Sequence, residues 1–450
     1  MNNRDLIERD LSVVWHPCTQ MKDHESWPPI PFKRGDGVYL EDFEGNRYID
    51  AVSSWWVNLF GHANPRINAA IADQLDKVEH VMMAGFTHEP VVDLSERLRE
   101  LTPASLTRCF YADNGSSGIE AALKMSFHYW RNTGRGEKTK FIALSNSYHG
   151  ETLGALAVGD VDLYKKTYSP LLMESIIVEG PDCFHRAEGD NWETHSRRMF
   201  AHMEETLAEH ADEACAVIVE PLVQCAGHMR MYHPVYLQLL REACDRHGVH
   251  LIADEIAVGF GRTGTMFACE QAGVAADFLC LSKGLTGGYL PLCAVLTTEP
   301  VYQAFYDEFD SLRAFLHSHS YTGNPLACRA ALATLELFHE HDAINANRER
   351  AEVLRVALLQ AFEGHPNVGD IRQHGMIAAV EMCPGGDRGR AYPWQERRGL
   401  RVYRHGLTRG CLLRPLGNTM YFMPPYVISH DEIRHLVTVA REGIDRATAD

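Results

Sequence analysis

The sequence predicts an α/β fold, with a mostly parallel, doubly wound sheet in a large domain followed by a smaller α+β domain. Short runs that are apolar on both faces, such as residues 249–253 and 278–281, alternate with helical patterns, as strands of a buried parallel sheet do. From about residue 330 the pattern changes to long amphipathic helices. The 450 residues are also too many for one simple core. We therefore expect an N-terminal segment (1–65), a large domain (66–330) and a small C-terminal domain (331–450).

Composition and charge exclude several classes of function. The net charge of -17 offers no basic surface to nucleic acid or to anionic lipid. The twelve cysteines form no CxxC pair, so neither a structural zinc site nor another metal site is predicted. The N-terminus lacks the apolar core of a signal peptide, and no apolar segment reaches 18 residues. We expect a cytoplasmic protein with reduced thiols that does not span a membrane.

The first hundred residues predict a hairpin and two helices. In residues 38–51 apolar and polar side chains alternate on either side of a turn. In residues 62–80 and 90–101 the apolar residues have helical spacing. Between them stand two adjacent tryptophans, Trp55 and Trp56. Because successive side chains of an extended chain point in opposite directions, we expect one to pack in the core and the other to face a cavity. The alternative is that both belong to the core or to an interface.

A helix start follows the next predicted strand. Residues 111–120 read YADNGSSGIE and precede a helical pattern, with Ser117 and Glu120 at the spacing of a capping box. Free backbone N–H groups at such a start bind anions, which makes Gly115 and Ser116 candidates for a phosphate site. A plain capped helix is the alternative interpretation.

Three further segments complete the predicted large domain. Residues 140–152 form a strand that runs into Tyr148, an aromatic side chain that can stack on a flat ring. Residues 160–200 lack clean periodicity and indicate a surface excursion. Residues 214–220 form a buried strand, and a loop then leads to a helix that ends at Gly248.

The residues that carry the chemistry stand at the ends of two buried strands. Asp254 closes the run 249–253, and Lys283 follows the run 278–281. Ligands of parallel sheets bind at the carboxyl ends of the strands. Pyridoxal 5′-phosphate needs this pair, because the lysine amine forms a Schiff base with its aldehyde and the carboxylate keeps its ring nitrogen protonated. Either residue alone is more commonly a surface strand end or a helix cap.

The segments ADEIAVGFGRTG (253–264) and LSKGLTGGYLPL (281–292) resemble the class-III aminotransferases, which are fold-type-I pyridoxal phosphate enzymes. The resemblance implies that Gly115 and Ser116 bind the cofactor phosphate and that Tyr148 lies over the cofactor ring. It also implies a homodimer with shared active sites. The loop 315–331 then brings His319 and Ser320 to the partner subunit's cofactor phosphate and Ser318 near its substrate.

A closer resemblance covers essentially the full length. WHPCTQ, SSWW, YHGET, QCAGHMRMYHP and RPLGNTMYFMPPY are similar to motifs of the 7,8-diaminopelargonate synthases of biotin synthesis. It implies transfer of an amino group to 8-amino-7-oxononanoate, giving 7,8-diaminononanoate, by a ping-pong mechanism through the Lys283 Schiff base. It also implies that Trp55 lines the substrate pocket, that Arg414 binds the acceptor carboxylate, and that Tyr421, Tyr148 and Lys283 contact substrate.

The amino donor is the less certain part of this resemblance. The family commonly uses S-adenosylmethionine, and its well-known members have a tyrosine that stacks on the donor's adenine where this chain has Cys18. We expect S-adenosylmethionine as the donor, with Trp55, Trp56 or another residue replacing that contact. Lysine, which some relatives use, is the alternative. The sequence leaves open whether Arg262 is structural or faces substrate.

Two other functions are compatible with the sequence. One is a different class-III enzyme, such as an ω-amino acid, ornithine or diamine aminotransferase, and turnover of simple ω-amines with pyruvate would identify it. The other is a non-catalytic binding protein on the same fold. The presence of both Lys283 and Asp254 disfavours the second.

Overall fold

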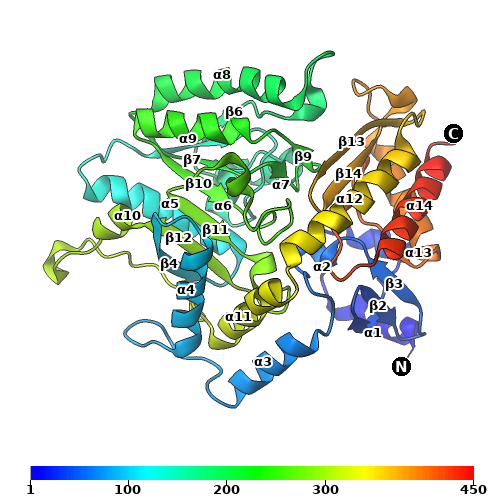
Figure 1. Cartoon of the computed structure of the whole chain (residues 1–450), viewed down its shortest axis with the longest axis horizontal. Helices are drawn as coiled ribbons and strands as arrows, with labels where there is room; N and C mark the ends of the chain where they lie inside the picture. The colour runs from blue at the N-terminus through cyan, green and yellow to red at the C-terminus, as the bar shows by residue number, and fades with distance from the viewer. Residues whose placement is uncertain (1) are drawn as a thin grey trace.

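A seven-stranded sheet forms the centre of the larger part of the chain in the computed structural model, which describes residues 2–450 (Figure 1). Strand β12 runs antiparallel to both of its neighbours, and the other pairs are parallel. In spatial order the strands are β4 (Leu106–Ala112), β12 (Cys293–Thr298), β11 (Phe278–Leu281), β10 (His250–Asp254), β7 (Ala214–Val219), β5 (Lys140–Leu144) and β6 (Ile176–Val178). The predicted mostly parallel sheet is confirmed.

Helices cover both faces of this sheet, which is why its strands are apolar on both sides. All six residues of β7 are buried, and they divide between two hydrophobic cores. Helix α5 packs with one core, and α8 and α9 pack with the other. The helices of this part are α3 (Pro65–Leu75), α4 (Glu89–Leu101), α5 (Gly115–Asn132), α6 (Leu153–Ala157), α7 (Asp162–Lys165), α8 (Trp192–His210), α9 (Val235–His247), α10 (Glu299–Gln303) and α11 (Pro325–Glu340).

The smaller part contains an antiparallel sheet and three helices, on the right of Figure 1. The sheet order is β13 (Val368–His374), β14 (Ile377–Met382), β17 (Thr419–Phe422) and β16 (Pro415–Leu416). The helices are α12 (Ala343–Phe362), α13 (Arg398–Thr408) and α14 (His430–Ala447). The small α+β unit expected from the C-terminal sequence is therefore present.

The N-terminal segment joins this smaller part through a third sheet. Its first helix is α1 (Asn3–Val13), and its strands β1 (Phe32–Asp36), β2 (Tyr39–Asp42) and β3 (Arg47–Asp50) include the predicted hairpin. Strand β15 (Cys411–Leu412) pairs in parallel with β3, so residues 49 and 411 are neighbours. This pairing places the N-terminal segment beside the C-terminal part of the chain (Figure 1).

Two local predictions are wrong. Residues 160–200 are not a simple surface excursion, because they include the edge strand β6 and the first half of α8. A three-residue strand and a helix rich in charged residues have too weak a hydrophobic periodicity to be recognised from the sequence. The capping box of Ser117 and Glu120 is also absent. Asn114 caps α5 by accepting the Ser117 N–H at 3.0 Å, and Glu120 instead accepts the N–H groups of residues 154 and 155.

The division into three segments remains a prediction. Residue 330 lies inside α11, which packs on α3 and α4 of the larger part, whereas α12 packs on β13 and α14 of the smaller one. Within residues 2–450, no helix combines the length and the apolarity needed to cross a membrane.

Candidate active site

A cavity of about 820 Å³ lies where the carboxyl ends of the central strands meet the smaller part of the chain. This volume is in the range of small-molecule and cofactor sites. Its walls come from the ends of β7, β10 and β11, the start of α5, the turn labelled α2 (Ser53–Trp56) and the turn 414–417. The lining residues include Trp55, Gly115, Ser116, Tyr148, Asp254, Lys283, Arg414 and Tyr421, eight of the residues predicted from the sequence.

Lys283 stands directly after β11, at the start of the 3₁₀ helix Lys283–Thr286. Its backbone has a φ of 46°, a left-handed conformation that is strained for a side chain with a Cβ and is typical of functional sites. Its Nζ lies 4.6 Å from the centre of the Trp56 ring. Burial lowers the pKa of the Lys283 amine below its ordinary value, and this effect outweighs the opposing influence of Cys225 and Asp254. The neutral amine that nucleophilic and proton-transfer chemistry requires is therefore favoured.

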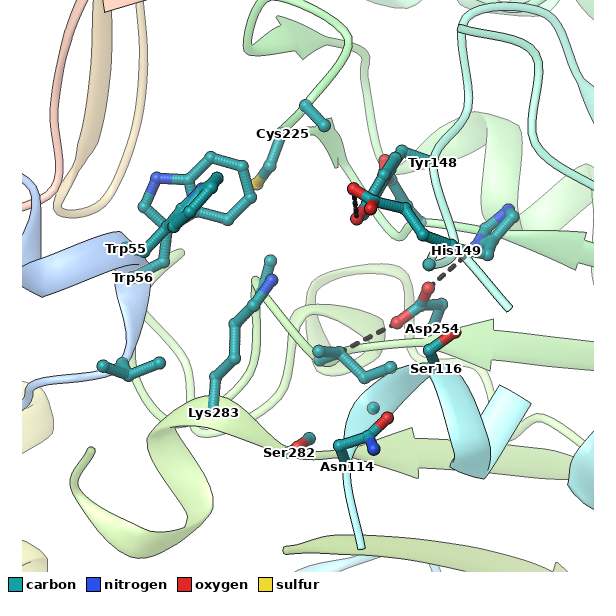
Figure 2. Close-up of a pocket in the computed structure, with 18 of the residues that line it drawn as sticks. Trp55, Trp56, Asn114, Ser116, Tyr148, His149, Cys225, Asp254, Ser282 and Lys283 are labelled. Carbon is teal, nitrogen blue, oxygen red and sulfur yellow. Dashed lines mark hydrogen bonds and ion pairs between the residues drawn. The ribbon is translucent and has the colours of Figure 1, made fainter. Parts of the chain in front are cut away.

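Asp254 ends the neighbouring strand β10 and is 4% exposed. The Nδ1–H of His149 donates to its Oδ2 at 2.7 Å, and the backbone N–H of Ile256 donates to its Oδ1 at 3.1 Å. Figure 2 shows both contacts, with the Lys283 amine pointing into the space between Asp254 and the tryptophans. The two donors fix the carboxylate, and each of its oxygens can still accept another hydrogen bond.

Two further buried groups, Glu220 and Cys225, line the cavity near Lys283. Burial, assisted by the charge of Asp254, raises the pKa of Glu220 well above its ordinary value. Its Oε2 is buried and finds no hydrogen-bond partner within residues 2–450. Burial also raises the pKa of the Cys225 thiol. Burial therefore favours the neutral forms of Glu220 and Cys225, and Asp254 is the cavity carboxyl group with two fixed donors.

The start of α5 offers an anion site to the cavity. The Asn114 side chain accepts the backbone N–H of Ser117. Within residues 2–450, the backbone N–H groups of Gly115 and Ser116 have no hydrogen-bond partner, and they lie at the positive end of the helix dipole. The Ser116 hydroxyl pairs with Thr152 Oγ1 at 2.8 Å. A Cβ on Gly150 would lie 2.3 Å from Ser116 Oγ, so only glycine permits this close approach.

The two tryptophans belong to a left-handed turn. Residues 53–56 have φ values of 52°, 48°, 77° and 71°, so the expectation from an extended chain does not apply. Trp56 is buried, Trp55 is 41% exposed, and both line the cavity. The turn is held by Ser53 Oγ, which donates to the Met423 carbonyl at 2.7 Å, and by Ser54 Oγ, which donates to Asp50 Oδ2 at 2.7 Å. These bonds offset a strain of about 1–2 kcal/mol for each left-handed residue.

Arg414 and Tyr421 contact the tryptophans from the smaller part of the chain. The Arg414 guanidinium carbon lies 4.8 Å from the centre of the Trp55 ring, and Trp56 Nε1 donates to the Tyr421 hydroxyl at 3.0 Å. Arg262 does not line the cavity. It is fully buried, and its guanidinium donates to the carbonyls of Pro424 and Asn58 at 2.9 Å. The structure thus gives Arg262 a structural position.

The cavity lining includes a carboxylate, Glu151, beside the paired rings of Tyr148 and Tyr164. The Tyr148 hydroxyl donates to Glu151 Oε1 at 3.0 Å, and the Tyr164 ring packs edge-on to Tyr148 with centroids 5.5 Å apart. Burial, followed by the influence of Glu151, raises the pKa of Tyr148. Cys18 lies on the other side of Glu151, with its Sγ 3.8 Å from Oε1. This end of the cavity is suited to a ligand that carries a positive charge.

Three predicted residues are not brought to this cavity. Ser318, His319 and Ser320 lie in the segment between α10 and α11 and do not line the cavity of their own chain. The His319 N–H donates to Thr322 Oγ1 at 3.0 Å, which folds the segment into a local turn. Their predicted roles in the site of a partner subunit stay predictions.

The residues present fit pyridoxal 5′-phosphate. The free N–H groups at the α5 start suit its phosphate, the fixed Asp254 carboxylate suits a protonated ring nitrogen, and the Lys283 amine lies within the same cavity. His149 Nε2 is buried and has no partner in the described part of the chain, so it too is open to a ligand. No group of three or more His, Cys, Asp and Glu side chains among residues 2–450 could hold a metal ion.

Sequence reasoning did not select His149, Glu220 or Cys225 as site residues, although all three line the cavity. His149 follows Tyr148 directly, and its role as the Asp254 donor requires the fold to be known. Glu220 ends β7 as Asp254 ends β10, so the strand-end rule that selected Asp254 applied equally to it. Cys225 has no sequence signal that separates a cavity wall from an ordinary core position, whereas Trp56 was considered together with Trp55 as a donor contact.

Comparisons with known proteins agree with this geometry. Residues 20–442 match the family described as aminotransferase class-III. Over 447 residues the chain is 46% identical to the adenosylmethionine-8-amino-7-oxononanoate aminotransferase of Helicobacter pylori, covering 98% of each. It also resembles the crystal structure of the enzyme of that name from Methanocaldococcus jannaschii (TM-score 0.93, 36% identity, covering 99% of this chain and 100% of that one). An omega transaminase from Pseudomonas jessenii in complex with PMP has a TM-score of 0.93 at 29% identity, covering 99% and 98%.

Proposed function

The chain belongs to the class-III aminotransferase family, and from this premise we propose that it converts 8-amino-7-oxononanoate to 7,8-diaminononanoate in biotin biosynthesis. The observation that carries the proposal is the convergence of Lys283, Asp254 and the Trp55–Trp56 turn on one cavity in a chain similar over its full length to relatives of that name. A different ω-amino acid or diamine aminotransferase is the second candidate, favoured by the likeness to omega transaminases.

Pyridoxal 5′-phosphate, when bound, supplies an electron-accepting ring that stabilises negative charge on the substrate carbon. Gly115 and Ser116 would hold its phosphate, Tyr148 would lie against its ring, and Asp254 would pair with its ring nitrogen. His149 keeps the Asp254 carboxylate oriented for this pairing through the 2.7 Å hydrogen bond. The presence of these residues in the cavity lining supports these roles.

Lys283 is the residue that moves protons. Because burial lowers the pKa of its amine, Nζ is available to accept a proton from the amine-bearing carbon of the donor. In the second half of the cycle the protonated Nζ returns a proton to carbon 7 of the acceptor. Donor and acceptor use the same cavity in turn, which makes the kinetics ping-pong.

The acceptor would bind between the two parts of the chain. Arg414 would pair with its carboxylate, since a guanidinium offers a planar pair of donors. Trp55 and Tyr421 would contact its apolar chain, and both lie beside the Arg414 turn. The left-handed turn of residues 53–56 fixes the tryptophan wall at this place.

We propose S-adenosylmethionine as the amino donor, with lysine as the alternative. Its positively charged sulfonium group would lie near Glu151, the carboxylate at the cavity mouth. Cys18, at the place of the usual tyrosine, has no aromatic face, so Trp55 or another ring at the mouth would contact the adenine. The names of the relatives support S-adenosylmethionine.

We also propose that the enzyme acts as a cytoplasmic homodimer with shared sites. Its twelve cysteines are free thiols, as suits a reducing compartment. Large apolar side chains are exposed along the segment that contains Ser320, and such a patch marks an interaction surface. The exposed residues there are Tyr306, Phe309, Leu312, Leu316 and Tyr321. A second copy would cover this surface and receive Ser320 at its own cofactor phosphate.

Mixed dimers test the shared site. Ser320→Ala removes a hydroxyl donor to a charged phosphate and is expected to weaken cofactor binding by roughly tenfold or more. When Ser320→Ala and Lys283→Ala subunits are co-expressed, each mixed dimer keeps one intact site if Ser320 serves the partner. At limiting cofactor we expect about a quarter of the wild-type activity. Half of the dimers are mixed, and each mixed dimer has one intact site of its two.

Ser311→Ala, in the same segment, is the control and should retain full activity alone. Mixed preparations no more active than their parents would contradict the shared site.

Growth of a biotin auxotroph that lacks this transamination tests the function. Expression of the chain should restore growth without biotin, and the purified enzyme should not turn over simple ω-amines with pyruvate at a comparable rate. Restoration requires the acceptor chemistry itself, so it separates the proposal from its rival. No growth, together with fast ω-amine turnover, would replace the proposal by the second candidate.

A further inference from the structure

The turn that carries Arg414 lies between helix α13 of the smaller part of the chain and a hairpin of the larger part. Residues 414–417 include the short strand β16, in which Pro415 and Leu416 pair with β17. Arg414 and Gly417 are exposed to the cavity, and the Arg414 guanidinium rests on the Trp55 ring. On one side the turn packs against α13, where a Cβ on Gly399 would lie 2.7 Å from Pro415 Cβ.

A hairpin of the larger part of the chain, formed by β8 (Val223–Gln224) and β9 (Arg230–Met231), contacts the turn from another direction. One side of its loop, at Cys225 and Ala226, lines the cavity. His228 and Met229 on the other side have φ values of 65° and 53°. Left-handed residues other than glycine are uncommon and persist only where surrounding contacts hold them.

His228 makes two bonds, and both go to the smaller part of the chain. Its imidazole Nδ1–H donates to the Leu416 carbonyl at 3.1 Å, inside the turn that follows Arg414. Its own carbonyl accepts from Arg372 Nη2 on β13 at 2.6 Å, while Arg372 Nε donates to the Met229 carbonyl at 2.7 Å. Arg372 is itself buried and paired with Glu381 at 2.7 Å. The left-handed backbone therefore turns two carbonyls toward one guanidinium and the imidazole toward the turn.

The contact between His228 and the turn is close and specific. A Cβ on Gly417 would lie 3.3 Å from His228 Cε1, so the ring packs directly against the turn. The partner atom is a carbonyl, which only accepts, so Nδ1 carries the proton. Burial lowers the pKa of His228, and its neutral form with the proton on Nδ1 satisfies this bond.

We infer that His228 is a positioning residue, which holds the 414–417 turn so that Arg414 meets the carboxylate of the acceptor. This inference rests on the proposed function, because it assigns the carboxylate to Arg414. His228 itself does not line the cavity. A small displacement of a positioned group weakens its interaction with substrate strongly, so one hydrogen bond to this turn controls acceptor recognition.

The variant His228→Gly tests the inference with little risk to the fold. Glycine adopts a positive φ freely, so the loop keeps its shape while the imidazole bond to Leu416 is lost. We expect the KM for 8-amino-7-oxononanoate to rise by about 3–10-fold, as the loss of one hydrogen bond predicts. The kcat and the KM for the donor should stay within about twofold, since the proposed donor contact lies at Glu151 and not at Arg414. His228→Gln, whose amide can donate to the same carbonyl, should restore much of the acceptor KM.

His374→Gln is the matched control. His374 Nε2 also bonds a carbonyl across the two parts of the chain, that of Tyr232 at 3.3 Å, and it does not touch the turn. It should leave the acceptor KM unchanged. An unchanged acceptor KM in His228→Gly, an equal rise in the donor KM, or the same rise in His374→Gln would each overturn the inference.

Binding of nonanoate, a simple carboxylate of the same chain length, separates this inference from the proposed function. Its dissociation constant for the holoenzyme, followed by tryptophan fluorescence, should weaken in His228→Gly and Arg414→Ala by comparable factors. If the wild-type enzyme binds nonanoate in this way and does not turn over 8-amino-7-oxononanoate, the proposed function fails and the positioning role stands. Equal nonanoate binding by wild type and His228→Gly would overturn the positioning role.

Discussion

Replacement of Lys283 by alanine is expected to abolish transamination. General acid–base catalysis by a positioned side chain contributes roughly 10²–10⁴-fold, and Lys283 also provides the amine that binds the cofactor aldehyde, so we expect a fall in kcat of at least about 10³-fold. The purified variant should lose the visible absorbance of the cofactor-bound lysine. It should also take up no label from borohydride at position 283.

A lysine outside the cavity provides the control for this experiment. Lys140, at the start of β5, pairs with Glu213 at 3.3 Å and has no access to the cavity. Lys140→Ala should retain the absorbance and the activity. A Lys283→Ala enzyme with a turnover within tenfold of wild type would show that another group carries the proton, and the site as described would be wrong.

Replacement of Asp254 by asparagine should have the second largest effect. The substitution keeps the size of the side chain and removes the negative charge that would face the ring nitrogen. Removal of a preorganised electrostatic contact of this kind typically lowers kcat by about 10²–10³-fold. Steady-state kinetics at saturating donor and acceptor measure this fall, and absorbance confirms that the cofactor is still bound.

The residue that orients Asp254 gives a graded comparison. His149→Gln removes the 2.7 Å bond to Oδ2 and leaves the charge in place, so its effect on kcat should be smaller than that of Asp254→Asn. Equal kcat values for Asp254→Asn and wild type would contradict the role of the carboxylate. A larger loss in His149→Gln than in Asp254→Asn would do the same.

The features of the fold that were predictable from sequence are those fixed by burial on both faces. Strands β7, β10 and β11 are continuous apolar runs because helices cover both sides of the sheet. Asp254 and Lys283 interrupt that pattern at two strand ends, and β10 pairs with β11, so the two side chains converge. Two observations were sufficient to find them: the apolar runs that mark the strands, and the rule that ligands bind at the carboxyl ends of parallel strands.

Features that depend on tertiary contacts were not predictable. The turn at residues 53–56 is left-handed because bonds from Ser53 and Ser54 reach a distant carbonyl and a buried carboxylate, and no local preference of Ser or Trp indicates this. The edge strand β6 has three residues, which is too few for a periodic signal. The N-cap of α5 is Asn114, whose side chain accepts the backbone N–H of Ser117. The spacing of Ser117 and Glu120 had suggested a capping box that begins at Ser117 instead.

Predictions that involve a second chain lie beyond both the sequence pattern and a single subunit. Ser318, His319 and Ser320 came only from resemblance to a family, and they lie away from the cavity of their own chain. Their placement depends on the geometry of an assembly. The mixed-dimer experiment addresses this assembly, and the kinetics of Lys283→Ala and Asp254→Asn do not.

Transfer of labelled nitrogen is the most direct test of the central claim that this cavity aminates 8-amino-7-oxononanoate. The purified holoenzyme would be given this acceptor with S-adenosylmethionine or lysine carrying ¹⁵N in the amino groups, and the product would be analysed by mass spectrometry. We expect 7,8-diaminononanoate with one ¹⁵N from S-adenosylmethionine, and no such product from the Lys283→Ala enzyme. The absence of labelled 7,8-diaminononanoate with both donors, from an enzyme that holds its cofactor, would contradict the claim.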